Sequence, residues 1–362
     1  MIKRVLIIFV LIISIVIIII SIATSILSPD EMTVLNFIKK NPNRSAIFLQ
    51  RNDTVFAIQN PYKNMPLAST VKIIIAIEYA CQVKNEIINP NEEVDLNDIN
   101  KYYIKNTDGD SHLKWIKSVS KKVFNNKITI REIAKGMMKY SSNANTEWLI
   151  EKLGVNKINS RIKILKLKSH SSIYYFVSAL FVANDTYPKL KGKELTSQMK
   201  ILSKEKYIEI SNSIHNKLKV DTTYKKKLVN LRMDIQKVWS DNLPSSTVSD
   251  YVSIMEKINS RNYFDAITQK HLEEVMEYIL ENPKNEERIE HIGMKGGSTA
   301  FVLTKALYST DNKGNKTELA YFFNNLSTFE TIELQKSMKE FELKILTNKK
   351  FRETIELTLR DN

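Results

Sequence analysis

The chain has 362 residues, of which 43% are hydrophobic, and carries a formal net charge of +14. This length and apolar content allow one large domain or two closely packed lobes. The 54 basic residues are spread along the chain among 40 acidic ones, with no basic block, zinc-finger spacing or phosphate-binding glycine loop. Nucleic acid is therefore excluded as an expected partner, and the charge indicates a solvated surface or attraction to anionic wall polymers or lipid headgroups.

Cysteine and histidine usage gives no sign of a disulfide or a metal site. Cys81 is the only cysteine and lies in an apolar helical stretch, so we expect an inert core residue rather than a reactive thiol. The five histidines do not occur at metal-ligand spacing; they are His112, His170, His215, His271 and His291. We predict no metal, no cofactor and no protein partner.

The N-terminus predicts a membrane anchor. Lys3 and Arg4 precede Val5–Leu27, a run without charge that is long enough to cross a bilayer as a helix. A secretory signal peptide with a weak cleavage site is the alternative. Because basic residues stay in the cytoplasm, the chain after residue 28 is expected outside the cell membrane, anchored there or secreted after cleavage.

The first folded elements are predicted to be a hairpin and a buried helix. Ser45–Gln50 and Thr54–Gln59 are typical of strands, and Arg51–Asp53 between them is typical of a turn. From Thr70 onward the pattern is helical and apolar all round, which predicts a helix buried at the centre of the molecule.

The middle of the chain, about residues 85 to 285, is dominated by helical periodicity. Thr129–Glu132 matches a capping box, and the helix that follows should end near Tyr140. The next helix begins near Asn145 and ends at Gly154 as a C-cap. Further helices are expected at Thr247–Asn259 and Gln269–Leu280.

The C-terminal part returns to strands. Thr299–Ser309 and Glu318–Phe323 flank the turn-rich Asp311–Lys316, and an amphipathic helix is expected from Thr331 to Leu346. The fold class is therefore α/β (α+β), with an antiparallel sheet built from both ends of the chain, helices on its faces and a separate all-helical lobe. The expected divisions are an anchor at 1–28 and a domain at 29–362, with a sheet lobe at 30–68 and 288–350 and a helical lobe at 69–287.

The motif Ser69-Thr-Val-Lys72 carries the first chemical signal. Ser69 lies where a loop becomes the buried helix, and Lys72 is one turn further along the same face. Burial disfavours the ammonium form, and a neutral amine can take the proton of a serine nucleophile. The alternative is a serine N-cap with a surface lysine, but Lys72 would then be the only charge between Lys63 and Glu78 on the most buried helix.

The motif Ser141-Ser-Asn143 lies in the link between two helices, where both side chains can project into a cleft. The alternative is a plain helix N-cap, a role that Ser142 or Asn145 could equally fill.

The third motif is Lys295-Gly-Gly-Ser298. Three of the eight glycines of the chain, including Gly296 and Gly297, fall within five residues here. Glycine is rare in strands unless something must approach the backbone closely, so an exposed strand edge for an extended substrate is indicated. Lys295 would offer positive charge to a substrate carboxylate. A tight turn before an edge strand is the alternative.

Together these motifs resemble the class A β-lactamase and penicillin-binding protein superfamily. The segments "MPLASTVKIIIAIEYA", "YSSNANTEWLIEKLG" and "MKGGSTAFVLTKALYS" are similar to that superfamily in content and order, and the similarity covers roughly residues 45 to 325. The resemblance implies that Ser69 is the acylated nucleophile, Lys72 its base and Ser141 the proton relay to the leaving group.

The resemblance also implies the substrate contacts. Asn143 would hold the substrate amide and Lys295 its carboxylate, with Gly296 and Gly297 along the bound substrate. The backbone N–H groups of Ser69 and Ser298 would form the oxyanion hole. The substrate implied is a β-lactam or a D-Ala-D-Ala-like peptide.

Two departures from the family pattern stand out. Gly296 occupies the place of a hydroxyl residue, so carboxylate recognition is expected to be weaker or to fall to Ser298 or Thr299. The segment "LKSHSSIYYFVSALFVANDTYPKL" lacks the glutamate that activates the deacylating water in class A enzymes, and neither Asp185 nor Glu194 has the expected neighbours. An acyl-enzyme should therefore form and hydrolyse slowly.

Three functions remain open from the sequence. The first is a serine hydrolase acting on β-lactams or related amides and esters, and the second is a D,D-carboxypeptidase or transpeptidase acting on wall peptides. The third is a non-catalytic sensor that binds wall fragments or β-lactams.

Overall fold

An antiparallel sheet organises the fold in the computed structural model, which describes residues 29–221, 223–227 and 232–360. In this part of the chain the main sheet has five strands in the order β2-β1-β9-β8-β7. The strands are β1 (Ser45–Arg51), β2 (Thr54–Gln59), β7 (Ile289–Ser298), β8 (Leu303–Asp311) and β9 (Lys316–Phe323). Strand β1 pairs with β9, with Ser45 opposite Phe323. The sheet is thus built from both ends of the chain, which confirms the prediction.

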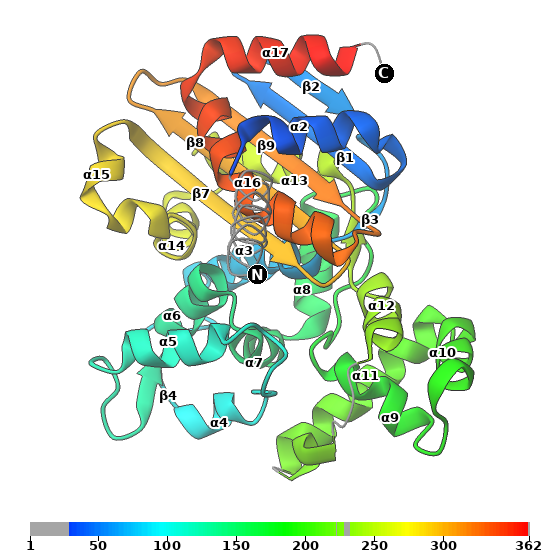
Figure 1. Ribbon diagram of the computed structural model, residues 1–362. Coiled ribbons are helices and arrows are strands. Elements are labelled where there is room, and N and C mark those ends of the chain that lie inside the picture. Colours follow the sequence, from blue (N-terminus) through cyan, green and yellow to red (C-terminus); the bar gives the residue numbers. More distant parts are fainter. Residues whose placement is uncertain (1–28, 222, 228–231, 361–362) are drawn as a thin grey trace, which may run out of the picture.

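Three helices cover one face of the sheet: α2 (Glu31–Lys40), α16 (Thr328–Thr347) and α17 (Lys349–Arg360) (Figure 1). Helix α16 begins with a complete capping box between Ser327 and Glu330. Its apolar side and those of α2 and α17 form one buried cluster with the sheet. The sequence patterns predict α16 but neither α2 nor α17, because short amphipathic segments without strong boundary signals are hard to recognise.

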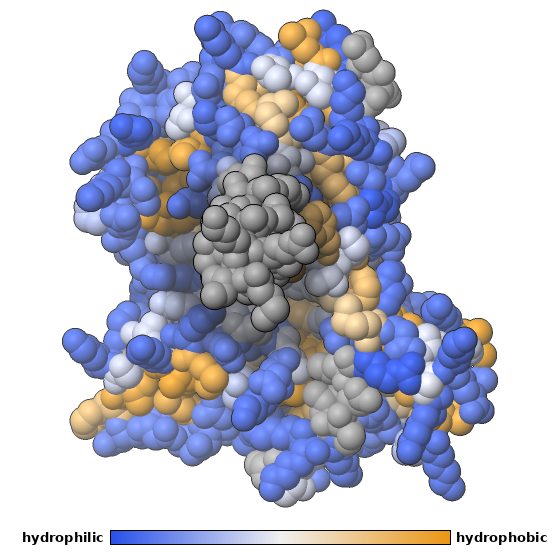
Figure 2. Space-filling view, in the orientation of Figure 1, coloured by the Kyte–Doolittle hydropathy of each residue, from blue (hydrophilic) through white to orange (hydrophobic). Residues whose placement is uncertain are grey.

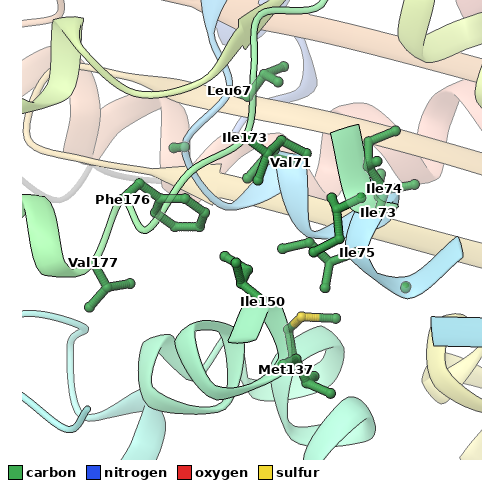
Figure 3. Packing of buried hydrophobic residues seen from close by; sticks show 14 of the residues in the cluster. Leu67, Val71, Ile73, Ile74, Ile75, Met137, Ile150, Ile173, Phe176 and Val177 are labelled. Carbon is green, nitrogen blue, oxygen red and sulfur yellow. The ribbon is translucent and has the colours of Figure 1, made fainter. Parts of the chain in front are cut away.

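The other face of the sheet meets α13 (Val248–Asn259) and the central helix α3 (Lys72–Lys84) with the 3-10 turn before it, Ala68–Val71. Every residue of α3 from Lys72 to Val83 is buried, which confirms the predicted central helix. Figure 3 shows isoleucine side chains of α3 in the same apolar cluster as Met137 and Ile150 from the helical lobe. This packing fixes the start of α3 between the sheet and the helical lobe.

The helical lobe lies below the sheet in Figure 1. Its longer helices are α5 (Ser111–Val119), α7 (Asn143–Leu153), α8 (Val155–Ile164), α10 (Gly192–Ile201), α11 (Lys204–Val220), α12 (Met233–Asp241) and α14 (Ala266–Met276). Its shorter helices are α4 (Leu96–Asn100), α6 (Ile130–Lys135) and α9 (Val182–Thr186), while α15 (Pro283–Glu286) lies beside β7 at the edge of the sheet (Figure 1). Two-stranded pairings join β3 (Met65–Pro66) to β6 (Ser245–Ser246) and β4 (Glu93–Asp95) to β5 (Lys127–Thr129).

The cap predictions agree with the structure. The Thr129 hydroxyl accepts the Glu132 N–H at the start of α6, and Gly154 is the C-cap of α7. Helix α7 begins at Asn143, two residues before the predicted start at Asn145.

One strand prediction is wrong in its boundaries. The sequence pattern predicts a single strand over Thr299–Ser309, but Thr299 N–H donates to the Val302 carbonyl at 2.9 Å, which closes a turn. Strand β8 therefore begins at Leu303, and the glycine motif lies in β7, the edge strand of the sheet. The sequence indicates a strand edge at this motif, and the structure shows that the motif belongs to a separate strand before the apolar one.

The predicted anchor at residues 1–28 lies outside the described residues. In the ranges that the structure describes, no helix combines the length and the apolar character needed to cross a membrane. The face shown in Figure 2 is largely hydrophilic over both lobes, with smaller hydrophobic areas between.

Candidate active site

Ser69 lies in the 3-10 turn Ala68–Val71, which leads directly into α3. Hydroxyl groups tie this turn to the sheet. Thr70 Oγ1 is 2.7 Å from Thr304 Oγ1 on β8, and the Thr304 hydroxyl lies 2.7 Å from the Leu67 carbonyl oxygen. These hydrogen bonds fix the turn against the sheet.

Lys72 is fully buried at the first position of α3. Its Nζ donates to the Ser141 carbonyl at 2.7 Å, to Ser141 Oγ at 3.2 Å and to Asn143 Oδ1 at 3.1 Å. Burial places its pKa well below the ordinary value; the positive charge of Lys295 lowers it further, and Asp108 partly opposes the shift. Burial therefore shifts Lys72 toward the neutral amine, which has two N–H groups for these three oxygens, whereas the ammonium has three.

Ser141 and Asn143 flank the residue that caps α7. The cap is Ser142, whose hydroxyl accepts the Asn145 N–H at 3.2 Å. Ser141 ends the π-helical turn Gly136–Tyr140 with φ of 67°, a left-handed conformation that is uncommon for serine. Ser142 fills the cap, while the side chains of Ser141 and Asn143 contact Lys72, which the alternative of a plain N-cap does not account for.

Strand β7 lies against the turn that carries Ser69. At Gly297 a Cβ atom would lie 2.5 Å from the Ser69 nitrogen and 2.6 Å from the Leu67 carbonyl oxygen, so only glycine allows this approach. At Gly296 the nearest atom to a Cβ would be the Thr304 carbonyl oxygen at 3.5 Å, which is ordinary contact. A larger residue is therefore excluded by the backbone at Gly297 but not at Gly296.

Lys295 is buried beside this approach, with 4% of its surface exposed. Its Nζ donates to the Gly296 carbonyl at 3.1 Å, and no carboxylate pairs with it among the residues that the structure describes. Burial, with the charge of Lys305 as a second cause, lowers its pKa to about 7. An anion that reached Lys295 would hold it in the charged form.

These residues meet at one cleft of about 470 Å³. Ser69, Ser141, Asn143, Gly296, Gly297 and Ser298 all line it, while Lys72 and Lys295 lie buried behind its wall. In the described part of the chain no hydrogen bond joins the Ser69 hydroxyl to Lys72. Such contacts are often long in a free enzyme and tighten when substrate binds. The structure thus brings all eight predicted site residues to one place.

Several cleft residues are not identified by the sequence motifs. Asp108 lines the wall formed by the helical lobe, and Phe176, Gln236 and Trp239 line another side. Trp239 Nε1 donates to the Phe176 carbonyl at 2.9 Å, which joins two segments that are far apart in sequence. None of these residues stands in a recognisable motif, so the sequence offers no signal for them.

The carboxylates considered for a deacylation role lie elsewhere. Asp185 is paired with Lys217 at 2.8 Å and bonded to Tyr224, at a second cavity. Glu194 is exposed on α10. Neither lines the cleft that contains Ser69. In the described ranges no group of three or more His, Cys, Asp or Glu side chains is arranged to hold a metal ion.

The fold is an antiparallel sheet beside a helical lobe, and serine and lysine side chains meet where the two join. This combination is typical of the β-lactamase-like class of proteins. A family model described as the beta-lactamase enzyme family matches residues 31–300, and the chain belongs to that family. A sequence search of curated proteins returned no match.

Solved structures share the fold. A point mutant of PBP-A, in an acyl-enzyme complex with penicillin G, is similar with a TM-score of 0.51 and 14% identity over 86% of this chain and 95% of that chain. A β-lactamase from Chitinophaga pinensis is similar with a TM-score of 0.52 and 12% identity over 86% of this chain and 98% of that chain. At these identities the likeness concerns the fold alone.

Proposed function

We propose that the protein is a serine hydrolase that forms an acyl-enzyme at Ser69 with β-lactams or related amides and esters. The observation that carries the proposal is the position of Lys72. Its amine is fully buried, has its pKa lowered by burial, and is bonded to Ser141 and Asn143 behind the cleft that Ser69 lines. Among the described residues no carboxylate forms an ion pair with Lys72, and a buried amine without one is poorly suited to a purely structural role.

The acylation step follows from this arrangement. The neutral Lys72 amine accepts the Ser69 proton as Ser69 Oγ attacks the substrate carbonyl carbon. The negative charge on the carbonyl oxygen is stabilised by the N–H groups of Ser69 and Ser298. The bond to the leaving group then breaks. Ser141 passes a proton to that group and regains one from Lys72, since its hydroxyl is 3.2 Å from Lys72 Nζ.

The substrate is held at two further points. Asn143 Oδ1 accepts from Lys72 at 3.1 Å, so its NH₂ group is turned to the opposite side and can donate to a substrate amide carbonyl. Lys295 attracts a substrate carboxylate to the edge strand, where Gly296 and Gly297 line the cleft.

Deacylation is expected to be slow. Asp108 is the only carboxylate that lines the cleft in the described residues, and it lies on the loop before α5 rather than in the segment after α7 where class A enzymes carry their glutamate. Glu147 on α7 is a buried glutamate that contacts that segment, and its carboxylate accepts the N–H groups of Val177 and Ser178. Without a proton acceptor at the attacking water the acyl-enzyme persists. A persistent acyl-enzyme is also expected of a D,D-carboxypeptidase, a transpeptidase or a sensor.

The test is mass spectrometry of the intact protein after exposure to benzylpenicillin. The expected result is an adduct on Ser69 that outlasts removal of the free compound, and its absence in Ser69→Ala and Lys72→Ala. Cys81→Ala is the control and should label normally, because Cys81 lies in α3 away from the cleft. Rapid loss of the adduct would favour an efficient β-lactamase, and absence of label on the folded protein would refute every acyl-enzyme function.

The cellular location proposed with this function is the outer side of the cell membrane, with the chain held by Val5–Leu27. The support is the basic start followed by an uncharged apolar run. Recovery in the membrane fraction, together with digestion of the domain by protease added to intact cells, would bear this out; recovery in the cytosol would contradict it.

A further inference from the structure

The two walls of the cleft carry opposite charges. Of the residues that line it within the described ranges, Asp108 and Lys305 are the only ones with charged side chains. Asp108 belongs to the loop before α5 in the helical lobe, and Lys305 belongs to β8 in the sheet. Lys295 lies buried behind the same sheet wall. A ligand between the walls therefore meets positive charge on the sheet side and a carboxylate on the helical side.

Only one of the two oxygens of the Asp108 carboxylate accepts a hydrogen bond. Its Oδ2 accepts the His112 N–H at 3.1 Å, while Oδ1 is covered and has no hydrogen-bond partner. Burial raises the pKa of the Asp108 carboxyl, and the backbone N–H groups of His112 and Asn143 and the charge of Lys72 oppose the shift only in part. The Asn143 N–H makes no hydrogen bond to Oδ1. An acceptor removed from water without a donor is unfavourable, so a donor brought by a ligand gains affinity here. The terminal torsion of an aspartate is soft, which lets the carboxylate turn an oxygen to the cleft.

The cations near Asp108 are engaged elsewhere. Lys72 interacts with Asp108 through charge, yet all of its side-chain hydrogen bonds go to Ser141 and Asn143. On the opposite wall Lys305 is paired with Glu342 at 3.3 Å. The other acid that influences Asp108 is Asp110, which is exposed and does not line the cleft. Asp108 is thus the negative group of the cleft that a substrate meets.

We infer that Asp108 selects acyl donors that carry an ammonium group, so that the preferred substrate is zwitterionic, with its carboxylate at the Lys295 side and its ammonium at Asp108. The inference rests on the proposed function, because the substrate is placed by acylation of Ser69. It adds a specificity residue outside the three sequence motifs. The ammonium donates to Asp108, and the acyl carbonyl lies between Ser69 and Ser298.

The test compares two penicillins that differ by one amino group. Ampicillin carries an amine on the side chain that benzylpenicillin lacks. The rate of adduct formation on Ser69 is measured for both in the wild type, Asp108→Asn, Asp108→Glu and Asp110→Asn. Comparing the ampicillin-to-benzylpenicillin ratio between variants cancels the intrinsic reactivity of each compound. Asp110→Asn is the matched control, since it removes the same charge two residues away and outside the cleft.

The expected result is a ratio that falls about tenfold in Asp108→Asn, equivalent to about 1.4 kcal/mol, and stays at the wild-type value in Asp110→Asn. Asp108→Glu keeps the negative charge and should retain part of the preference, which guards against a folding defect in the asparagine variant. Equal ratios in the wild type and Asp108→Asn would overturn the inference and leave the acyl-enzyme intact. Absence of any adduct with both penicillins would refute the proposed function and this inference with it.

Discussion

The side-chain nitrogen of Lys72 donates to the main-chain carbonyl of Ser141 at 2.7 Å, a shorter contact than the 3.2 Å to the Ser141 hydroxyl. The carbonyl is available because Ser141 adopts a left-handed conformation at the end of a π-helical turn. The position of the amine is therefore set by the backbone, and the hydroxyl is left for proton transfer.

Removal of the Ser141 hydroxyl should slow acylation without displacing Lys72. We expect Ser141→Gly to reduce the rate of adduct formation with benzylpenicillin about 100-fold, the scale of a lost proton relay. Glycine accepts the φ of 67° without strain, so the backbone contact to Lys72 should persist. The rate is measured by time-resolved mass spectrometry. Ser141→Ala, which lacks the hydroxyl but strains the backbone, should be as slow; a wild-type rate in Ser141→Gly would contradict the relay role.

The two glycines of the third motif should respond differently to a methyl group. Gly297→Ala places a Cβ 2.5 Å from the Ser69 nitrogen, so we expect the turn that carries Ser69 to shift and labelling to be lost. Gly296→Ala meets nothing closer than 3.5 Å and should fold and label as the wild type does. Circular dichroism and adduct formation check both. Equal labelling of the two variants would show that the close approach of β7 is not required.

Much of the fold follows from local patterns. The hairpin β1–β2, the apolar helix α3 and the caps at Thr129 and Gly154 are recognisable because each follows a periodic or capping rule. The motif residues are recognisable because a serine nucleophile and its lysine base must lie one helical turn apart, and because paired glycines are rare in strands. Burial of α3 from Lys72 to Val83 then explains why the Lys72 amine has a lowered pKa.

What the sequence does not predict depends on contacts between distant segments. Asp108 and Trp239 reach the cleft from loops and helices whose sequences carry no functional pattern, and only packing places them beside Ser69. The sequence indicates a strand edge at Lys295–Ser298 but not that β7 begins at Ile289, because Lys295, Gly296 and Gly297 have low strand propensity and pairing with β8 overrides it.

The buried charge of Lys295 should give acylation an alkaline limit. Its pKa is about 7, so the free protein carries the charge below that pH and loses it above. Adduct formation with benzylpenicillin, which bears a carboxylate, should therefore decline as the pH rises through about 7. Arginine stays charged throughout, so Lys295→Arg should remove this decline. An ester substrate without a carboxylate is the control, and its rate should not decline over this pH range. An unchanged decline in Lys295→Arg would show that another group causes the decline.

Glu147 should support stability rather than catalysis. It is fully buried on α7, where it accepts the N–H of Ser178 at 3.1 Å and lies 3.3 Å from His215 Nδ1. Because removing one partner of a buried pair leaves the other uncompensated, we expect Glu147→Gln to lower the free energy of unfolding by about 3 kcal/mol. Urea denaturation measures this, with the exposed Glu194→Gln as a control that should change little.

The pH dependence of this loss of unfolding free energy shows whether it comes from the contact between Glu147 and His215. Burial opposes charge on His215, but the contacts of Nδ1 with Glu147 and of Nε2 with the Glu151 carboxylate at 3.4 Å outweigh burial and raise its pKa above the ordinary value. The stabilisation is thus complete below about pH 6.5, where free histidine is charged, and is lost as the pH rises through the raised value. The cost of Glu147→Gln should be largest at acid pH, while the lifetime of the Ser69 adduct stays unchanged, since Glu147 does not line the cleft. A longer-lived adduct in this variant would instead make Glu147 the base of deacylation.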